Sequence, residues 1–270
     1  MTLVQKRPGG WHINYLGWSG FHIHRVGDQH QFIDPPKGTC FPIQKPICIF
    51  ITHGHPEHLG GTLDFLRDAR VSQPVTVVAS QTVCSYLQAQ TRQEKVTFSI
   101  ATPGQFHRQA QSVGFEVFQW QHMPLLPPGV GPAFRHIYQI IRGYRAAWRI
   151  LKMTMAGPKG AGAMLGYVLH LDDESSVIVY GEGLHRRCRA DAVAEIGRRV
   201  PGATILVAAE PEDCAELPQL VKASAASEAI LYEPHRHWRD VFSLPHADLE
   251  ALQEAVSRIG VSTNIAHPAR

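Results

Sequence analysis

The sequence predicts a mixed α/β fold, and three observations lead to this prediction. Of its 270 residues, 44% are hydrophobic and 18% are charged, as in a globular protein with a sizeable core. Short apolar runs such as residues 47–51 and 75–79 predict buried strands. Segments with helical periodicity, such as residues 81–90 and 190–200, follow strands in both halves of the chain. Each half therefore provides strands and then helices.

The N-terminal segment predicts strands joined by a hairpin. Residues 11–26 alternate between apolar and polar side chains in two stretches. Gly27 and Asp28 provide a turn, from which residues 31–34 return, and two prolines end that strand after Asp34. Further strands are expected at residues 95–100, 106–110, 115–120, 166–171, 176–180, 204–208 and 229–232, and further helices at residues 62–70 and 248–260.

Cysteine usage and charge restrict the class of protein. Five cysteines are scattered without metal-type pairing, which indicates free thiols in a reducing compartment. Residues 1–10 contain no apolar run of signal-peptide type, and no apolar stretch is long enough to span a membrane. The cytoplasm is therefore the expected location. A formal net charge of +3 makes nucleic-acid binding an unfavoured interpretation.

Histidines with metal-ligand spacing follow the strand expected at residues 47–51. His53 and His55 stand one residue apart just past the strand, and Glu57 and His58 follow one turn later. Imidazole and carboxylate groups bind zinc and similar divalent cations. Such a group can seat two metal ions, as two-metal hydrolases require. A fortuitous histidine-rich surface tract is the alternative, but a strand before the motif and a glycine-rich helix entry after it favour a built site.

The motif His-x-His-x-Glu-His resembles the His-x-His-x-Asp-His signature of the metallo-β-lactamase superfamily, with Glu57 in the place of aspartate. Ile33-Asp34-Pro35 ahead of the motif is similar to the ascorbate-phosphate lactonase and N-acyl phosphatidylethanolamine phospholipase D branch. The resemblance covers residues 11–124 and 164–242. It implies a four-layer αββα sandwich, and the chain is expected to form a single domain over residues 1–270.

The resemblance also implies a binuclear metal site. His122 follows the strand expected at residues 115–120, where the superfamily places a third ligand to the first metal. Glu182 follows residues 176–180, where the superfamily has an aspartate that bridges the two ions. Two aspartates are thus replaced by glutamates, which indicates a site rebuilt around longer carboxylates. The implied ligands are His53, His55 and His122 for the first ion, Glu57, His58 and His237 for the second, and Glu182 between them.

The last ligand and the catalytic groups are less directly marked. His235 and His237 both follow the strand expected at residues 229–232, and His237 is preferred because His237-Trp238 resembles a motif of related hydrolases. Catalytic roles are expected for Glu57 and His237, with Glu57 orienting water or passing a proton. Asp34 fits a partner of a ligand histidine and a simple turn position equally well. The implied cofactors are two divalent metal ions, zinc in this superfamily, with manganese and iron as alternatives because the glutamates add oxygen donors.

Residues 125–163 lie outside the resemblance and form an expected insertion. Residues 133–155 have helical period, with an apolar stripe and a basic stripe beside it. No Asp or Glu occurs at residues 117–171. Gly143 weakens the middle of this helix by roughly 1 kcal/mol relative to alanine and allows a bend. The apolar stripe consists of Phe134, Ile137, Ile141, Tyr144, Trp148, Leu151 and Met155, and the basic stripe of Arg135, Arg142, Arg145, Arg149 and Lys152.

Three interpretations of this helix stay open. It packs on the body of the protein or on a second copy in a homodimer. It forms a lid in which Arg145, Arg149 and Trp148 bind an anionic, lipid-like substrate. It lies on a membrane surface, as basic amphipathic helices do.

The sequence thus predicts a hydrolase in which a metal-activated water attacks an ester, lactone or phosphodiester of an anionic, partly apolar substrate. The alternative is a non-catalytic member that binds a partner or a membrane through the basic helix. The two replacements of aspartate by glutamate favour that alternative.

Overall fold

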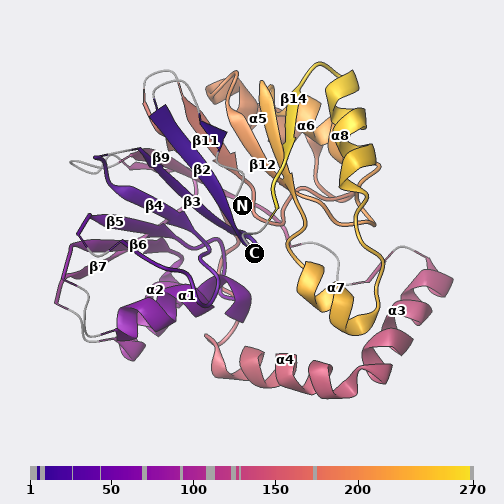
Figure 1. Ribbon diagram of the computed structural model, residues 1–270, viewed down its shortest axis with the longest axis horizontal. Helices are drawn as coiled ribbons and strands as arrows, with labels where there is room; N and C mark the ends of the chain where they lie inside the picture. Colours follow the sequence, from indigo (N-terminus) through magenta and orange to yellow (C-terminus); the bar gives the residue numbers. More distant parts are fainter. Residues whose placement is uncertain are drawn as a thin grey trace. The chain divides into compact units, whose positions relative to one another are not determined.

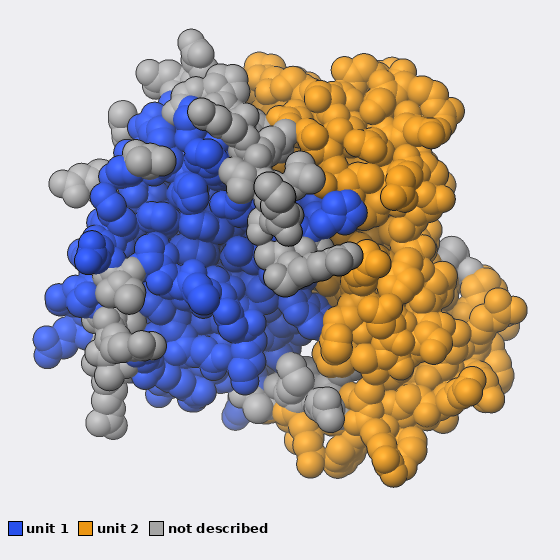
Figure 2. Space-filling model, in the orientation of Figure 1, with its two compact units in different colours: residues 1–120, 157–181, 266–270 blue, residues 121–156, 182–265 orange. Residues whose placement is uncertain are grey.

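A computed structural model describes residues 10–25, 27–42, 44–68, 72–91, 94–107, 113–122, 126–127, 129–172 and 175–267, with the backbone of residues 5–6. The side chains of residues 149, 150, 153, 154 and 156 lie outside this description. The chain divides into two compact units (Figure 2). Unit 1 comprises residues 1–120, 157–181 and 266–270, and unit 2 comprises residues 121–156 and 182–265. The single domain with an insertion at residues 125–163 stays a prediction.

Unit 1 contains a seven-stranded sheet whose strands follow chain order (Figure 1). The first four strands pair antiparallel, and the fourth to the seventh pair parallel. Along β2 every second side chain is buried, which is why the alternating sequence pattern is found there. The strands are β1 (Gln5–Lys6), β2 (Trp11–Gly17), β3 (Gly20–Arg25), β4 (His30–Ile33), β5 (Ile47–Phe50), β6 (Val75–Ala79) and β7 (Val96–Ile100).

Helices α1 (Pro56–Arg67) and α2 (Gln81–Gln90) cover one face of this sheet and bury their apolar sides against β5 and β6. Helix α1 begins six residues before the predicted start at residue 62, because Pro56 opens it with a backbone dihedral that suits the first helical turn. The helix also lies close to the loop after β4. A Cβ atom on Gly61 would come within 2.3 Å of the Pro36 carbonyl oxygen, so only glycine fits there.

Four further strands of unit 1 pair antiparallel and pack against the first sheet. The hydroxyl of Tyr167 donates to the carbonyl of Ile51 at 2.7 Å, and the rings of Phe50 and Phe115 lie 5.1 Å apart. These strands are β8 (Phe106–His107), β9 (Gly114–Gln119), β10 (Leu165–His170) and β11 (Ser176–Val179). Of the strand predicted at residues 106–110, the last three residues lie outside the described part of the chain.

Unit 2 contains three parallel strands, β12 (Thr204–Ala208), β13 (Glu228–Tyr232) and β14 (Ser262–Ile265). Helix α8 (Leu249–Arg258) packs on β13 and β14, and it contacts α6 (Leu217–Ala223), which in turn contacts α5 (Ala190–Arg199). The strands of the chain fall into two sheets, with helices against each, in agreement with the predicted αββα fold class. Helix α6, strand β14 and helix α7 (Arg236–Phe242) were not predicted.

The predicted helix over residues 133–155 is two helices, α3 (Val130–Arg142) and α4 (Tyr144–Ala156), which meet at an angle in Figure 1. The helical prediction and the bend that Gly143 allows are both confirmed, because the chain breaks at Gly143. A Cβ atom at that position would lie 2.6 Å from the Phe242 ring, so glycine lets the break approach α7 closely. No described helix combines the length and the apolarity needed to cross a bilayer. All five cysteines are free.

Candidate functional site

The loop between β5 and α1 brings histidine nitrogens of unit 1 together. His53 is fully buried, and His55 is half-buried one residue from the start of α1. Nε2 of His53 faces Nδ1 of His55 at 3.0 Å. Two nitrogens on one tetrahedral zinc stand about 3.3 Å apart, given zinc–nitrogen bonds of about 2.05 Å. His58 lies nearby in the first turn of α1, and its ligand atoms are within 4.8 Å of those of His53. The arrangement therefore suits a metal ion with imidazole ligands.

Asp34 supports these histidines from behind. It is 1% exposed and has a left-handed backbone with φ of 41°. Its Oδ1 accepts from the backbone N–H of Thr52 at 2.8 Å, and its Oδ2 accepts from the Thr52 hydroxyl at 2.6 Å. Nδ1 of His58 lies 2.8 Å from the same Oδ2. One buried carboxylate thus contacts the loop backbone, a hydroxyl and a histidine.

The Asp34 contacts determine which histidine nitrogens remain for a cation. The only proton of the Thr52 hydroxyl points to Asp34, so its oxygen, 3.1 Å from Nδ1 of His53, acts as an acceptor there. Nδ1 of His53 therefore carries the proton, and its Nε2 presents a lone pair. The negative charge of Asp34 beside Nδ1 of His58 favours a proton on that nitrogen as well. Carboxylates that orient metal-binding imidazoles in this way are a general feature of metal sites.

Glu57 lies in the first turn of α1 and is half-buried. An acidic side chain is favourable there, because the helix dipole is positive at its N-terminus. This position accounts for Glu57 without a metal. Its expected roles as a metal ligand and a catalytic group stay predictions.

Unit 2 contributes carboxylates around a different histidine. Glu182, at 2% exposure, lies with Oε1 3.1 Å from Nε2 of His235 and with Oε2 3.9 Å from Nε2 of His122. His122 follows β9, and Glu182 follows β11, as predicted from the strand ends. Within unit 2, Glu182 thus lies beside two imidazoles, those of His122 and His235.

His235 is held between two buried carboxylates. Its Nδ1 lies 2.7 Å from Oε1 of Glu210, opposite its contact with Glu182. Burial alone would lower the pKa of His235, but the two carboxylates outweigh burial and raise that pKa well above its ordinary value. Burial would likewise raise the pKa of Glu210, whereas His235 and Arg239 lower it. Arg239 donates to Glu210 from Nε at 3.0 Å and from a terminal nitrogen, and to Glu212 at 2.8 Å.

The preference for His237 over His235 is not supported by the geometry. His237 is exposed on α7, where its ring packs 5.0 Å from that of Trp238. His235 precedes α7, so its side chain stays at the end of β13, and His237 is carried onto the helix surface. Helical geometry turns the two histidines to different sides, and the ligand role of His237 stays a prediction.

Comparison with solved structures establishes the fold. The metallo-β-lactamase fold protein YhfI from Bacillus subtilis matches with a TM-score of 0.61 and 13% sequence identity, over 94% of this chain and 90% of that chain. The chain has the metallo-β-lactamase fold. Zinc-bound PqqB from Methylobacterium extorquens matches with a TM-score of 0.47 and 12% identity, over 93% of this chain and 85% of that one. A diphosphatase of the PhnP family matches with a TM-score of 0.48 and 14% sequence identity, over 93% of this chain and 82% of that chain.

Sequence comparison finds a shorter match. A UPF0173 metal-dependent hydrolase from Alkaliphilus metalliredigens (strain QYMF) is 38% identical over 82 residues, which is 28% of this chain and 34% of that protein. The match thus spans about a third of that relative's length. No sequence-family model matches the chain. The metallo-β-lactamase fold predicted from the histidine motif is therefore confirmed, and the lactonase-like and phospholipase-like branch stays a prediction.

Four residues around the motifs of this metallo-β-lactamase fold were not assigned from the sequence: Thr52, His235 as the preferred ligand, Glu210 and Arg239. A usable signal existed for Glu210. It follows β12 by two residues, and His235 follows the neighbouring parallel strand β13. Carboxyl ends of parallel neighbours lie at the same sheet edge, so this rule could have placed the two side chains close together. Arg239 gave no such signal, because it reaches Glu210 only through the turn of α7.

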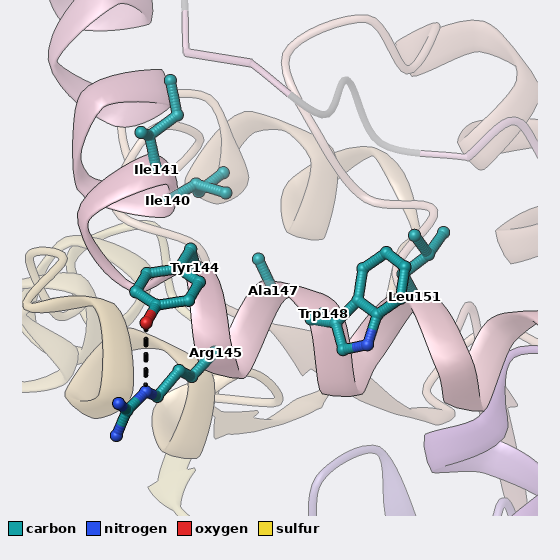
Figure 3. Close-up of a pocket in the computed structure, with 7 residues that line it drawn as sticks. All are labelled: Ile140, Ile141, Tyr144, Arg145, Ala147, Trp148 and Leu151. Carbon is teal, nitrogen blue, oxygen red and sulfur yellow. Dashed lines mark hydrogen bonds between the residues drawn. The ribbon is translucent and has the colours of Figure 1, made fainter.

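The residues expected to bind substrate, Arg145, Trp148 and Arg149, all lie on α4, and Figure 3 shows the first two. Arg145 and Trp148 line a groove of about 610 Å³ within α3 and α4, together with five residues of which none is charged. Nε of Arg145 donates to the Tyr144 hydroxyl at 3.2 Å. The side chain of Arg149 lies outside the described residues. The substrate-binding role of Arg145, Arg149 and Trp148 stays a prediction.

Proposed function

We propose that this protein is a metal-dependent hydrolase that cleaves an ester or phosphodiester bond. The metallo-β-lactamase fold, the partial match to a metal-dependent hydrolase and the grouped histidines and carboxylates support the proposal. The observation that carries it is the Asp34–Thr52 pair, in which the Thr52 oxygen is left to accept from Nδ1–H of buried His53, so that Nε2 is available to a cation. Holding a buried imidazole in one tautomer with its lone pair facing a second imidazole is the arrangement a metal ion needs.

Two divalent ions are proposed, zinc first, with manganese and iron as alternatives, because the donors are imidazole nitrogens and carboxylate oxygens. In this assignment His235 takes the position expected for His237, and the remaining ligands are as predicted. The proposed ligands are His53, His55 and His122 for the first ion, and Glu57, His58 and His235 for the second, with Glu182 shared.

The protein residues have separate tasks in this reaction. Bound metal ions supply Lewis acidity and lower the pKa of water towards neutrality. Asp34 holds two histidines in the tautomer that binds a cation. Glu210, kept ionised by Arg239, holds His235 in place. Because a ligating imidazole must be neutral, metal binding at His235 displaces the proton that its carboxylates favour, and affinity there should rise with pH. Glu57 orients water or passes a proton to the leaving group.

An anionic, partly apolar substrate is the proposed class. The basic and apolar residues of α3 and α4 support it, since guanidinium groups pair with phosphate or carboxylate and apolar side chains accommodate a hydrocarbon tail.

Metal analysis and turnover on simple substrates test the proposal together. Purified protein should contain bound divalent metal and hydrolyse bis-p-nitrophenyl phosphate or a p-nitrophenyl ester. His53→Ala should lose metal and turnover. His235→Ala should lower the metal content, whereas His237→Ala, a matched change two residues away, should leave it unchanged. A protein that binds no metal, or that binds metal and turns over no phosphodiester, ester or lactone, would contradict the hydrolase.

A second candidate function is a non-catalytic binding protein of the same fold. The exposed apolar side chains of α3 and α4 favour it. Metal without turnover, combined with binding through those helices, would support this candidate over the hydrolase.

A further inference from the structure

Helices α3 and α4 direct their apolar side chains to solvent. In α3, Val130 is 87% exposed and Phe134 is 74% exposed, and no described residue of that helix is buried. In α4, Trp148 is 58% exposed and Met155 is 77% exposed. An amphipathic helix of a globular protein usually buries this side. Large contiguous apolar surfaces on a protein generally mark an interaction site.

Among the described residues, two contacts that attach this helix pair to the rest of unit 2 lie outside the apolar stripe. Gly143, at the break, lies against the ring of Phe242. Nε2 of Gln139 donates to the backbone carbonyl of Ser243 at 2.9 Å, and α3 contacts α7. A glycine and a polar side chain thus contribute to this attachment. The orientation of the helix pair keeps the apolar stripe facing outward.

Positive charge surrounds the exposed stripe. Arg135, Arg142, Arg145 and Lys152 are exposed on the two helices, and no acidic residue occurs at residues 117–171. The guanidinium of Arg145 lies 5.9 Å from the Tyr144 ring, and the ammonium of Lys152 lies 5.8 Å from the Trp148 ring. Basic side chains next to Trp and Tyr are typical of helices that lie at the boundary between lipid headgroups and acyl chains.

The groove in Figure 3 adds a place for hydrocarbon. Ile141, Tyr144, Trp148 and Leu151 line it where α3 meets α4, and Arg145 is the one charged residue among its described lining residues. An apolar surface with a basic rim is complementary to acyl chains beneath anionic headgroups.

We propose that α3 and α4 form a membrane-surface anchor that binds bilayers containing anionic phospholipid. A second copy of this chain is a poorer occupant, because a twofold contact between two such faces would bring arginines and lysines against each other without acidic partners. The anchor does not depend on hydrolysis, and it would function equally in a non-catalytic protein. If the hydrolase proposal also holds, the anchor places the enzyme where amphiphilic substrates reside.

Vesicle flotation with the full-length protein tests the anchor. The probes are vesicles of phosphatidylcholine alone and vesicles in which about a third of the lipid is phosphatidylglycerol. The protein should float with the anionic vesicles, and binding should weaken at least tenfold as salt rises from about 0.05 to 0.5 M. Ile141→Ser/Trp148→Ser should weaken vesicle binding at least tenfold, because it removes apolar side chains that contact acyl chains. Arg142→Glu/Arg145→Glu should also weaken it, because it reverses the charge that attracts anionic headgroups.

A matched control separates the anchor from general electrostatics. Arg198→Glu/Arg258→Glu changes net charge equally on α5 and α8 and should keep binding within about twofold. Circular dichroism of each variant checks that it is folded. Equal loss in the control pair, or no flotation of the parent protein, would overturn the anchor. So would a homodimer in sedimentation velocity that Ile141→Ser/Trp148→Ser converts to monomer, since the stripe would then be its interface. None of these outcomes bears on metal content or turnover.

Discussion

A histidine group of unit 1, on β3 and β4, and His235 of unit 2 have opposite surroundings. In unit 1, the rings of His22, His24 and His30 lie 4.5 to 5.3 Å apart on β3 and β4. Burial, and then the neighbouring histidines, lowers the pKa of His22 to about 3 and that of His24 to about 4. In unit 2, His235 lies between Glu182 and Glu210, which raise its pKa well above the ordinary value despite burial. Both environments are desolvated, so the presence of a carboxylate decides the charge of the imidazole.

Buried carboxylates contact two histidines of the candidate site, one in each unit. Asp34 contacts His58, and Glu210 contacts His235, whereas the β3–β4 histidines contact one another. A carboxylate beside a buried imidazole fixes the orientation of its ring, which a metal ligand requires.

Among the substitutions that test this contrast, Glu210→Gln should have the largest effect, a loss of folding stability. The substitution removes the charge that pairs with both His235 and buried Arg239, so the free energy of unfolding should fall by about 3 kcal/mol. Glu195→Gln is the control, because it breaks only an exposed pair with Arg199 and should cost about 0.5 kcal/mol or less. Urea denaturation of the metal-free proteins measures both changes. Equal losses would show that Glu210 is no more than a surface acid.

Asp34→Asn should have the second-largest effect, a loss of metal affinity. An amide nitrogen cannot accept from the Thr52 hydroxyl and His58, so metal affinity should fall about 10- to 100-fold. Competition with a chromophoric chelator measures this affinity. Asp28→Asn, in the turn beside Arg25, should leave the affinity unchanged. If the metal affinity of Asp34→Asn equals that of the parent protein, Asp34 does not support the metal site and acts only in the turn.

Thr52→Val should have a smaller effect on the same measurement. It removes the hydroxyl between Asp34 and His53, but the Asp34 contacts with His58 and with the backbone N–H at residue 52 remain. A loss of about three- to tenfold in metal affinity is expected, since one of three orienting contacts is gone. A loss as large as that of Asp34→Asn would mean that the carboxylate acts on the metal site only through Thr52.

Substitution of His22 and His24, which contact other histidines, should have the smallest effect on stability at neutral pH. Their folded pKa values lie below the unfolded value of 6.5, so the unfolded chain binds more protons as pH falls. Stability should therefore be full above about pH 6.5 and decline towards about pH 4. His22→Gln/His24→Gln should flatten this decline in urea denaturation while changing little at neutral pH. An unchanged slope would show that these histidines are not the groups that titrate.

Local signals in the sequence predicted the strands better than the helix ends. The apolar runs at β5, β6 and β12 correspond to buried strands, because a central strand buries both faces. The start of α1 was placed too late, since a histidine-rich stretch carries no apolar periodicity. The break at Gly143 depended on the ring of Phe242, which is 99 residues away in the sequence (242 minus 143).

The sequence by itself determined the metallo-β-lactamase fold, the strand ends that carry the candidate ligands, and the amphipathic pattern of residues 133–155. These features depend on short-range periodicity and on a motif within six residues of chain, His53 to His58. Tertiary structure alone decided that His235 and not His237 meets Glu182, that Glu210 and Arg239 support it, and that the apolar stripe of α3 and α4 faces outward. Those outcomes depend on which side chains from distant segments share one desolvated space, and local patterns do not encode that.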